Sequence, residues 1–520
     1  MASEPIISIN YWKDLQVTKQ DIEFLHNYLF ETETPLTTRE MVAELIRERY
    51  RAESLSVQQR RQSGGKIYFP RDAYRSGDDL VFPALDWVHG KVSETRKGVN
   101  PSIGEFDVLT VQMEDGAERL FASKLTVHSL NEDPGSAEED DFDPDAILRS
   151  QGNTLDKKLE TRLRDDEEIV QIAGRWFPRA LLIDINVGNL NLAEAVLDMS
   201  AGEPLPTSAL LKDVSLPEGE NPKLAEFSLN LALQEDERFD EVGPAGEVLW
   251  CLHRLEPQDV REVPFYLQYS PIDHDRSVLT EEMLELEKQL DDELSEIDID
   301  DSELSEEVTI PLIYPHLRVG TLPLSSRVKS LFPTAYEAPR VRFTLVDGTT
   351  DKRFPGWVVR EHKYVYGLND FYKDSELMPG SLVSVRKGEN PGEVIIEARN
   401  YRSTKDWLRT AILGTDGIMV FAMLKQSVSA EFNERMSIAV PAFDTVDQAW
   451  IQTSKRPLEQ LVVSLIREMS KLTPQGHVHA QELYSAVNII RRVPPAPLFA
   501  ILQTKPEISH VGDLHFKLSD

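Results

Sequence analysis

The fold is decided by the segment around Val341-Arg-Phe-Thr-Leu-Val-Asp-Gly348, in which apolar and polar residues alternate. This period of two is typical of a half-buried strand, and Asp347-Gly348 favours a hairpin turn after it. The further elements predicted here are strands over residues 354–359, 364–369 and 382–385, a short helix over 374–377 and a turn at Pro379-Gly380. Residues 311–402 are therefore predicted to form a β domain.

Three stretches elsewhere in the chain resemble one another. They begin with Pro35-Leu-Thr-Thr, Pro204-Leu-Pro-Thr and His477-Val-His-Ala, and each opens a second helix after an apolar helical pattern. The second and third stretches continue into a third helix and a hairpin with a Val-Gly turn, where glycine permits a sharp bend. We therefore predict winged-helix domains over residues 190–255 and 457–518, and a partial helix-turn-helix within residues 1–63.

A chain of 520 residues is too long for one core, so several domains are expected. The predicted fold class is α+β and multidomain, with winged-helix or helix-turn-helix units and small β-barrels joined by acidic linkers. The predicted segments are a helical region (1–63), a small β-barrel (66–130), an acidic linker (131–170), a winged-helix domain (171–270), an acidic helix and linker (271–310), a pseudobarrel (311–402), a connecting α/β segment (403–456) and a second winged-helix domain (457–520).

The net charge of −33 is unevenly distributed along the chain. Residues 271–310 carry 16 acidic and 2 basic residues, whereas residues 311–520 carry 22 and 26. Because phosphate contacts dominate affinity for nucleic acid, DNA binding is expected in the C-terminal half. From Glu293 onward the acidic tract is expected to be too charged to bury. An alternative is that the acidic region 131–310 binds a protein partner or mimics nucleic acid.

Cysteine content and hydropathy predict the compartment. The single cysteine, Cys251, excludes a disulfide framework and a cysteine-based zinc site, and it is expected in the core of a hairpin strand. The first residues lack the basic and apolar regions of a secretion signal, and no run of 18 apolar residues occurs. We expect a cytoplasmic protein that does not enter a membrane.

No motif for phosphate-loop, dinucleotide, zinc-protease or serine-hydrolase chemistry occurs, so a non-enzymatic protein without cofactor or metal is expected. Asp145, Asp156 and Lys158 match the spacing of a restriction-nuclease magnesium site. Such a site needs carboxylates on adjacent apolar strands, which residues 140–160 do not supply. His477 and His479 alternate as metal ligands can, but no third ligand is apparent, and a structural role is expected.

Residues 234–250, Gln-Glu-Asp-Glu-Arg-Phe-Asp-Glu-Val-Gly-Pro-Ala-Gly-Glu-Val-Leu-Trp, resemble the closing line of the HARE-HTH type of winged helix. That line has the form Arg-Phe, Val-Gly, Trp. The C-terminal copy has His515-Phe516 in place of the tryptophan. This family occurs in DNA-associated proteins and in the acidic delta subunit of bacterial RNA polymerase, so the resemblance implies contact with DNA or with protein.

Residues 311–402 resemble the plant B-three DNA-binding pseudobarrel and its relatives in restriction-endonuclease recognition domains. The resemblance rests on Leu322-Pro-Leu-Ser-Ser-Arg-Val-Lys-Ser-Leu-Phe-Pro333, on the strand and turn ending at Gly348, and on Tyr364–Val385. This chain has Ser381 where the family usually has aspartate, and Phe371 where it has tryptophan. The resemblance implies that arms flanking the barrel read bases and that other cations contact phosphates.

The candidate DNA-binding residues follow from these two resemblances. The base-reading candidates are Arg327, Lys329, Arg340 and Arg342, the phosphate-binding candidates are Lys352, Arg353, Arg360 and Lys363, and the candidates of the C-terminal winged helix are Arg491, Arg492 and Lys505. We expect a non-enzymatic DNA-associated protein, a transcription or DNA-recognition factor that binds through its C-terminal half. The alternatives are an acidic interaction adaptor, for example one associated with RNA polymerase, and the recognition subunit of a restriction-type system.

Overall fold

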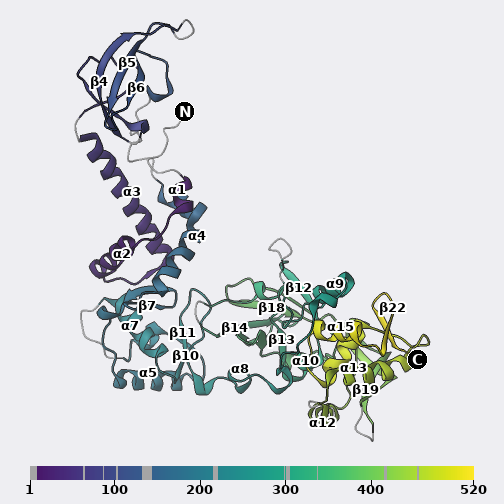
Figure 1. Cartoon of the computed structure of the whole chain (residues 1–520). Helices are drawn as coiled ribbons and strands as arrows, with labels where there is room; N and C mark the ends of the chain where they lie inside the picture. The colour runs from purple at the N-terminus through teal and green to yellow at the C-terminus, as the bar shows by residue number, and fades with distance from the viewer. Residues whose placement is uncertain are drawn as a thin grey trace. The chain divides into compact units, whose positions relative to one another are not determined.

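The computed structural model describes residues 9–62, 65–85, 87–100, 104–131, 143–214, 221–297, 299, 305–335, 338–414, 419–453 and 456–519. The chain is mixed α+β, with several separate sheets (Figure 1). It divides into two compact units. Unit 1 comprises residues 1–183 and 219–227, and unit 2 comprises residues 184–218 and 228–520.

A seven-stranded half-barrel sheet lies in unit 2. Its strands in spatial order are β12 (Glu307–Pro311), β17 (Leu382–Lys387), β18 (Glu393–Glu397), β14 (Arg340–Asp347), β15 (Arg353–Val359), β16 (Tyr364–Tyr366) and β13 (Thr321–Pro323). Neighbouring strands are antiparallel except β14 and β18, which are parallel. Val341, Phe343 and Leu345 are buried, which confirms the predicted alternation.

The short helix of this sheet lies earlier in the sequence than predicted. Helix α11 occupies Asn369–Asp374, and residues 374–377 are not helical beyond Asp374. The helix forms at the earlier position because Phe371 and Tyr372 are buried against the half-barrel core. A second helix, α10 (Tyr314–Val319), joins β12 to β13.

The three similar stretches fold alike, as a two-residue strand followed directly by a helix, a further helix and a hairpin. Repeat 1 contains α2 (Lys19–Thr32), β1 (Leu36–Thr37), α3 (Thr38–Gln62), α4 (Pro144–Arg164), β7 (Ile169–Ile172) and β8 (Arg175–Pro178). Repeat 2 contains α5 (Val187–Met199), β9 (Leu205–Pro206), α6 (Thr207–Leu210), α7 (Pro222–Gln234), β10 (Phe239–Glu241) and β11 (Leu249–Leu252). Repeat 3 contains α13 (Leu458–Met469), β21 (Val478–His479), α14 (Ala480–Ile490), α15 (Pro495–Thr504), β22 (Ile508–Gly512) and β23 (His515–Leu518).

The sheets of the three repeats share one topology and one register. In each, the short strand pairs antiparallel with the last strand, which also pairs with the strand before it. The equivalent partners are Leu36 with Trp176, Leu205 with Trp250, and Val478 with Phe516. The internal repeat predicted from sequence is therefore present in the local structure of all three stretches.

A hydrogen bond between the last strand and the second helix distinguishes the first two repeats from the third. The indole Nε1 of Trp176 donates to Thr38 Oγ1 at 3.0 Å, and that of Trp250 donates to Thr207 Oγ1 at 3.2 Å. Repeat 3 has Ala480 at the position of the threonines and phenylalanine at that of the tryptophans. Donor and acceptor are absent together there, so no buried polar group is left without its partner.

Repeat 1 is interrupted rather than incomplete. A five-stranded sheet lies between its second and third helices, formed by β2 (Lys66–Ile67), β3 (Asp79–Phe82), β4 (Val88–Lys97), β5 (Asp107–Met113) and β6 (Glu118–Ser123). The prediction of a partial unit within residues 1–63 missed the third helix and the hairpin because this sheet separates them from the rest of the repeat. Helix α4 occupies much of the predicted linker 131–170, whose residues 132–142 lie outside the described residues.

The described part of the acidic tract 279–308 contains the expected helix, but Glu293, where the tract was expected to become too charged to bury, is buried in unit 2. Helix α9 (Glu281–Leu290) begins after the N-cap Thr280 and buries an apolar face that includes Met283, Leu286 and Leu290. The acidic residues that follow, Asp291, Asp292 and Glu293, are buried as well, at 5–7% exposure. This part of the tract is a structural element and not a flexible linker.

The segment predicted to connect the half-barrel to repeat 3 is mainly a long hairpin. It is formed by β19 (Asn400–Leu413) and β20 (Met419–Ala430), and helix α12 (Phe443–Thr453) follows it. Ala411, Met419 and Phe421 bury one part of the hairpin in the core shared with repeat 3.

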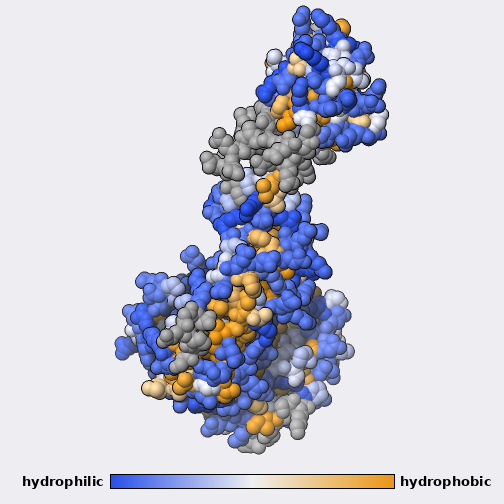
Figure 2. Space-filling model, turned by 90° about the vertical axis from the view of Figure 1, so that its left-hand side faces the viewer, coloured by the Kyte–Doolittle hydropathy of each residue, from blue (hydrophilic) through white to orange (hydrophobic). Residues whose placement is uncertain are grey.

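The surface is in keeping with a charged residue content of 28%. Figure 2 shows one face of the molecule, and most of its visible surface is hydrophilic. Among the described residues, no helix combines the length and the apolar character that crossing a bilayer requires.

Candidate functional site

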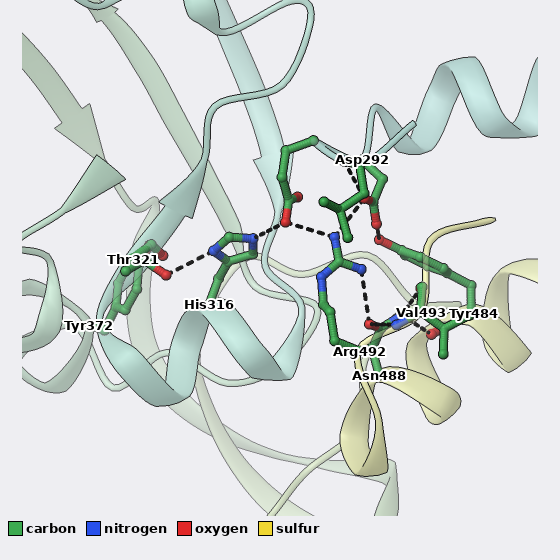
Figure 3. A network of polar contacts seen from close by, with 10 residues as sticks. Asp292, His316, Thr321, Tyr372, Tyr484, Asn488, Arg492 and Val493 are labelled. Atoms are coloured by element: carbon green, nitrogen blue, oxygen red, sulfur yellow. Dashed lines mark hydrogen bonds and ion pairs between the residues drawn. The ribbon is translucent and has the colours of Figure 1, made fainter. Parts of the chain in front are cut away.

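Arg492 is the centre of a buried polar network in unit 2 (Figure 3). Its Nη2 lies 2.6 Å from Asp292 Oδ1 and 2.7 Å from Glu293 Oε1, and its side chain is fully buried. Its Nη1 donates to Asn488 Oδ1 at 3.2 Å. Tyr484 donates its hydroxyl to Asp292 Oδ2 at 2.5 Å. The network therefore joins the acidic tract after α9 to helix α14 of repeat 3.

The same network extends into the half-barrel. His316 Nε2 lies 3.2 Å from Glu293 Oε1, and its Nδ1 lies 2.8 Å from Thr321 Oγ1. Tyr372 of α11 donates its hydroxyl to the carbonyl of Thr321 at 2.7 Å. The acidic tract and the adjacent half-barrel thus meet repeat 3, about 200 residues further along the chain, at a few buried polar groups.

The pKa values of the groups in this network are shifted by burial and by the charge of the Arg492 guanidinium. Burial opposes charge on Glu293, but Arg492 and His316 hold the pKa of its carboxyl below the usual range. Burial raises the pKa of Asp292, and the neighbouring Glu293 carboxylate raises it further, against the opposing effect of Arg492. Burial lowers the pKa of Arg492, but the two acids outweigh this and raise it. The network consists of one persistent cation and the acids that compensate it, an arrangement suited to holding segments together.

Of the predicted DNA contacts of repeat 3, Arg492 is buried, and Arg491 and Lys505 are partly exposed. Arg492 is buried, so its prediction as a DNA-binding residue is wrong. Arg491 Nη1 donates to the carbonyl of Arg456 at 2.9 Å, and Lys505 lies 4.0 Å from Glu507. Helix α15, predicted as the third helix of a winged-helix domain, is buried against α9 in the core of unit 2. Repeat 3 therefore does not present this helix to a DNA groove.

The predicted base-reading arginines of β14 are paired with acids of repeat 2. Arg340 lies 3.1 Å from Asp240 and 3.0 Å from Glu256. Arg342 binds Glu203 with both terminal nitrogens, at 2.7 and 2.8 Å. These guanidinium groups hold repeat 2 on the half-barrel, and the structure does not leave them free to read bases.

The other predicted half-barrel cations are more exposed. Arg327 is half-buried, Lys329 and Lys363 are exposed, and Arg360 is exposed while donating Nη1 to the carbonyls of Ala335 and Ala338. Lys352 lies 3.5 Å from Asp374, and Arg353 lies 3.1 Å from Glu393. Lys352 and Arg353 lie at the start of β15, Arg360 and Lys363 lie in the turn between β15 and β16, and Arg327 and Lys329 lie in the segment after β13.

A group with metal-ligand chemistry surrounds Arg340. Among the described residues, Asp240, His253 and Glu256 alone bring three ligand atoms within 4.8 Å of one another. Arg340 already supplies a cation to both carboxylates. Burial and the neighbouring Asp240 raise the pKa of Glu256 to about 8. The guanidinium and this retained proton neutralise the group, so the residues do not fit a metal site.

The two sequence patterns with the spacing of metal ligands contain residues with structural roles. Asp145, Asp156 and Lys158 all lie on helix α4, which lacks the paired strands of a nuclease site. Asp156 pairs with Arg39 at 2.7 Å. His479 Nδ1 accepts from the backbone of Gln481 and caps α14.

A basic and aromatic surface that the sequence analysis missed lies on the β19–β20 hairpin. Residues 400–407 are all exposed, and Trp407 is 58% exposed, which is unusual for so large an apolar side chain. Lys425, its direct cross-strand partner, lies 5.5 Å from the centre of its ring. Lys405 lies two residues along the same face. We call Lys405, Trp407 and Lys425 the ribbon face.

The ribbon face itself carries two lysines and no acidic residue. Among the described residues, no acidic side chain forms an ion pair with Arg402, Lys405 or Lys425. Asp406 points to the opposite face because successive side chains alternate across a strand. The signal in the sequence was the pattern Lys405-Asp-Trp407 opposite Lys425, but the pairing register was not known.

We predict that Arg492→Met destabilises unit 2 by about 3–5 kcal/mol, because it leaves Asp292 and Glu293 buried without their cation. Urea unfolding followed by tryptophan fluorescence measures the loss. Lys505→Met removes a partly exposed cation of the same repeat and should change stability by less than about 0.5 kcal/mol. Equal effects of the two substitutions would contradict the assignment of Arg492 to the core.

A second prediction concerns pH. The Glu256 carboxyl has a pKa of about 8 in the folded state, against an ordinary value of 4.5. Between these values the folded state binds more protons, so its stability should fall as pH rises from 5 to 8.

Glu256→Gln should reduce this fall, whereas Glu262→Gln, at a neighbouring exposed position, should not. Urea unfolding at pH 5 and pH 8 makes the comparison. An unchanged pH dependence in Glu256→Gln would show that this carboxyl does not retain its proton.

Comparison with protein-family models, with curated proteins and with solved structures finds no match for this chain. Its function must therefore be inferred from the geometry of its own side chains.

Proposed function

We propose that the chain is a non-enzymatic DNA-associated protein that contacts DNA through the ribbon face. The observation that carries this proposal is an exposed two-stranded ribbon bearing Trp407 between Lys405 and Lys425. A two-stranded ribbon fits the major groove of DNA, and an exposed ring stacks on unpaired bases. The lysines supply the charge that phosphates require.

The surrounding architecture supports this proposal. We infer that the three repeats are winged-helix units, because each has a short strand, two further helices and a closing hairpin in one shared register. We also infer a B-three type of half-barrel, an inference supported by the short helix α11 before its sixth strand in sequence, β17. In unit 2 these parts serve as a frame that holds the ribbon, because repeat 3 and the predicted β14 arginines are engaged inside the molecule.

A second candidate function, that of a protein-interaction adaptor, is favoured by helix α5. Val187, Leu192 and Met199 of this helix are 45–87% exposed, although Leu190 and Leu197 on its other side are buried. A helix that is apolar on two sides presents its free side to a partner. This surface lies within the region 131–310 for which a protein partner was predicted.

The test is DNA binding by the full chain, measured by fluorescence anisotropy with a labelled duplex and the corresponding single strand at low salt. Lys405→Glu/Lys425→Glu should weaken binding by about tenfold or more and reduce its salt dependence, since two phosphate contacts are lost. Trp407→Ala should weaken binding to the single strand more than binding to the duplex if the ring stacks on bases.

The matched control is Lys329→Glu/Lys363→Glu, which makes the same charge change at exposed half-barrel positions. It should weaken binding by less than about threefold. Equal losses of DNA affinity in the two variants would show that binding depends on the overall electrostatic field of the protein and not on the ribbon face. No binding at low salt would refute the DNA proposal and favour the adaptor, whose α5 surface neither variant alters.

A further inference from the structure

A cavity opens on the half-barrel, and no residue of the ribbon face lines it. Its volume is about 230 Å³, and it lies between the turn that follows β14, strands β15 and β16, and helix α11. Phe354, Trp357, Tyr366 and Phe371 supply aromatic walls. Gly367 allows β16 to pass close to β15, because a side chain there would meet the carbonyl oxygen of Pro355 at 2.6 Å. The aromatic walls are thus set by the sheet itself.

The polar groups of this cavity are mainly carboxylates. Asp347, Asp370 and Asp374 line it, and Lys352 is its only basic residue. Asp347 is held in place, because its two oxygens accept from Thr349 N at 2.9 Å and from Thr350 Oγ1 at 2.5 Å. The lining therefore carries a formal excess of two negative charges over aromatic surface.

We propose that this cavity binds the side chain of a lysine or arginine presented by a partner polypeptide. Ring faces attract cations, and the carboxylates add a charge complementary to an ammonium or guanidinium group. The carboxylates repel phosphates and other anions. A bare metal ion would leave the aromatic walls unused, whereas an alkyl chain that ends in a cation matches both the walls and the charge.

Lys352 has a role in this proposal. It lies 3.5 Å from Asp374, and both side chains are more than half exposed, so the pair is weak and can open. Lys352 thus occupies part of the site as an internal competitor when no ligand is bound. Removing it should strengthen ligand binding, an effect that simple loss of structure would not produce.

The experiment uses the full chain labelled with 5-fluorotryptophan and follows its ¹⁹F resonances during titration with n-butylammonium. The resonance of Trp357 is assigned by its absence in Trp357→Phe. It should shift saturably with a dissociation constant in about the millimolar range, as expected for so small a ligand. The neutral isostere 1-butanol should shift it far less.

Matched variants separate charge recognition from structural damage. Asp370→Asn/Asp374→Asn should weaken binding by about threefold to tenfold, whereas Asp351→Asn, a nearby acid outside the cavity, should leave it unchanged. Lys352→Met should tighten binding by about twofold to threefold.

No saturable shift of Trp357, or equal shifts with the amine and the alcohol, would overturn the proposal. So would equal weakening by the cavity variant and the Asp351 control. DNA binding through the ribbon face can fail or succeed independently, because no residue of the ribbon lines this cavity.

Discussion

The salt bridge of Arg492 with Asp292 and Glu293 is the interaction on which the structure of unit 2 depends. A buried guanidinium without acids, or buried acids without a cation, would cost several kcal/mol, so the three residues can only be buried together. Their burial requires the acidic tract, repeat 3 and, through His316, the half-barrel to assemble in one arrangement. The net charge of this tract is therefore a poor guide to its place in the fold.

Local patterns predicted the elements of unit 2 well. The alternation of Val341, Phe343 and Leu345 gave strand β14 and its turn, and the resemblance among three short stretches identified the starts of three similar repeats. These predictions succeeded because side-chain period and turn chemistry act within a few residues. The third helix and hairpin of repeat 1 escaped detection because a whole sheet is inserted before them.

The candidate site was harder to predict because it depends on pairing between distant residues. Arg492 and Asp292 are 200 positions apart, and Arg340 is 84 positions from Glu256. A cation's value as a DNA contact depends on whether an acid neutralises it, which composition does not reveal. The ribbon lysines were overlooked for the opposite reason, since they lie in a segment that had no recognisable motif.

The protein thus uses many of its charges for assembly. The two sites that we propose for binding, the basic ribbon face and the acidic cavity of the half-barrel, combine aromatic rings with opposite charge. The central claim is that the acidic tract belongs to the core, and hydrogen exchange of the native chain tests it most directly. Backbone amides of α9 and of Asp291–Glu293 should exchange at least about a hundredfold more slowly than an unstructured peptide, since core segments open rarely. Exchange at the unprotected rate throughout this tract would show that it is a solvated linker and would contradict the account.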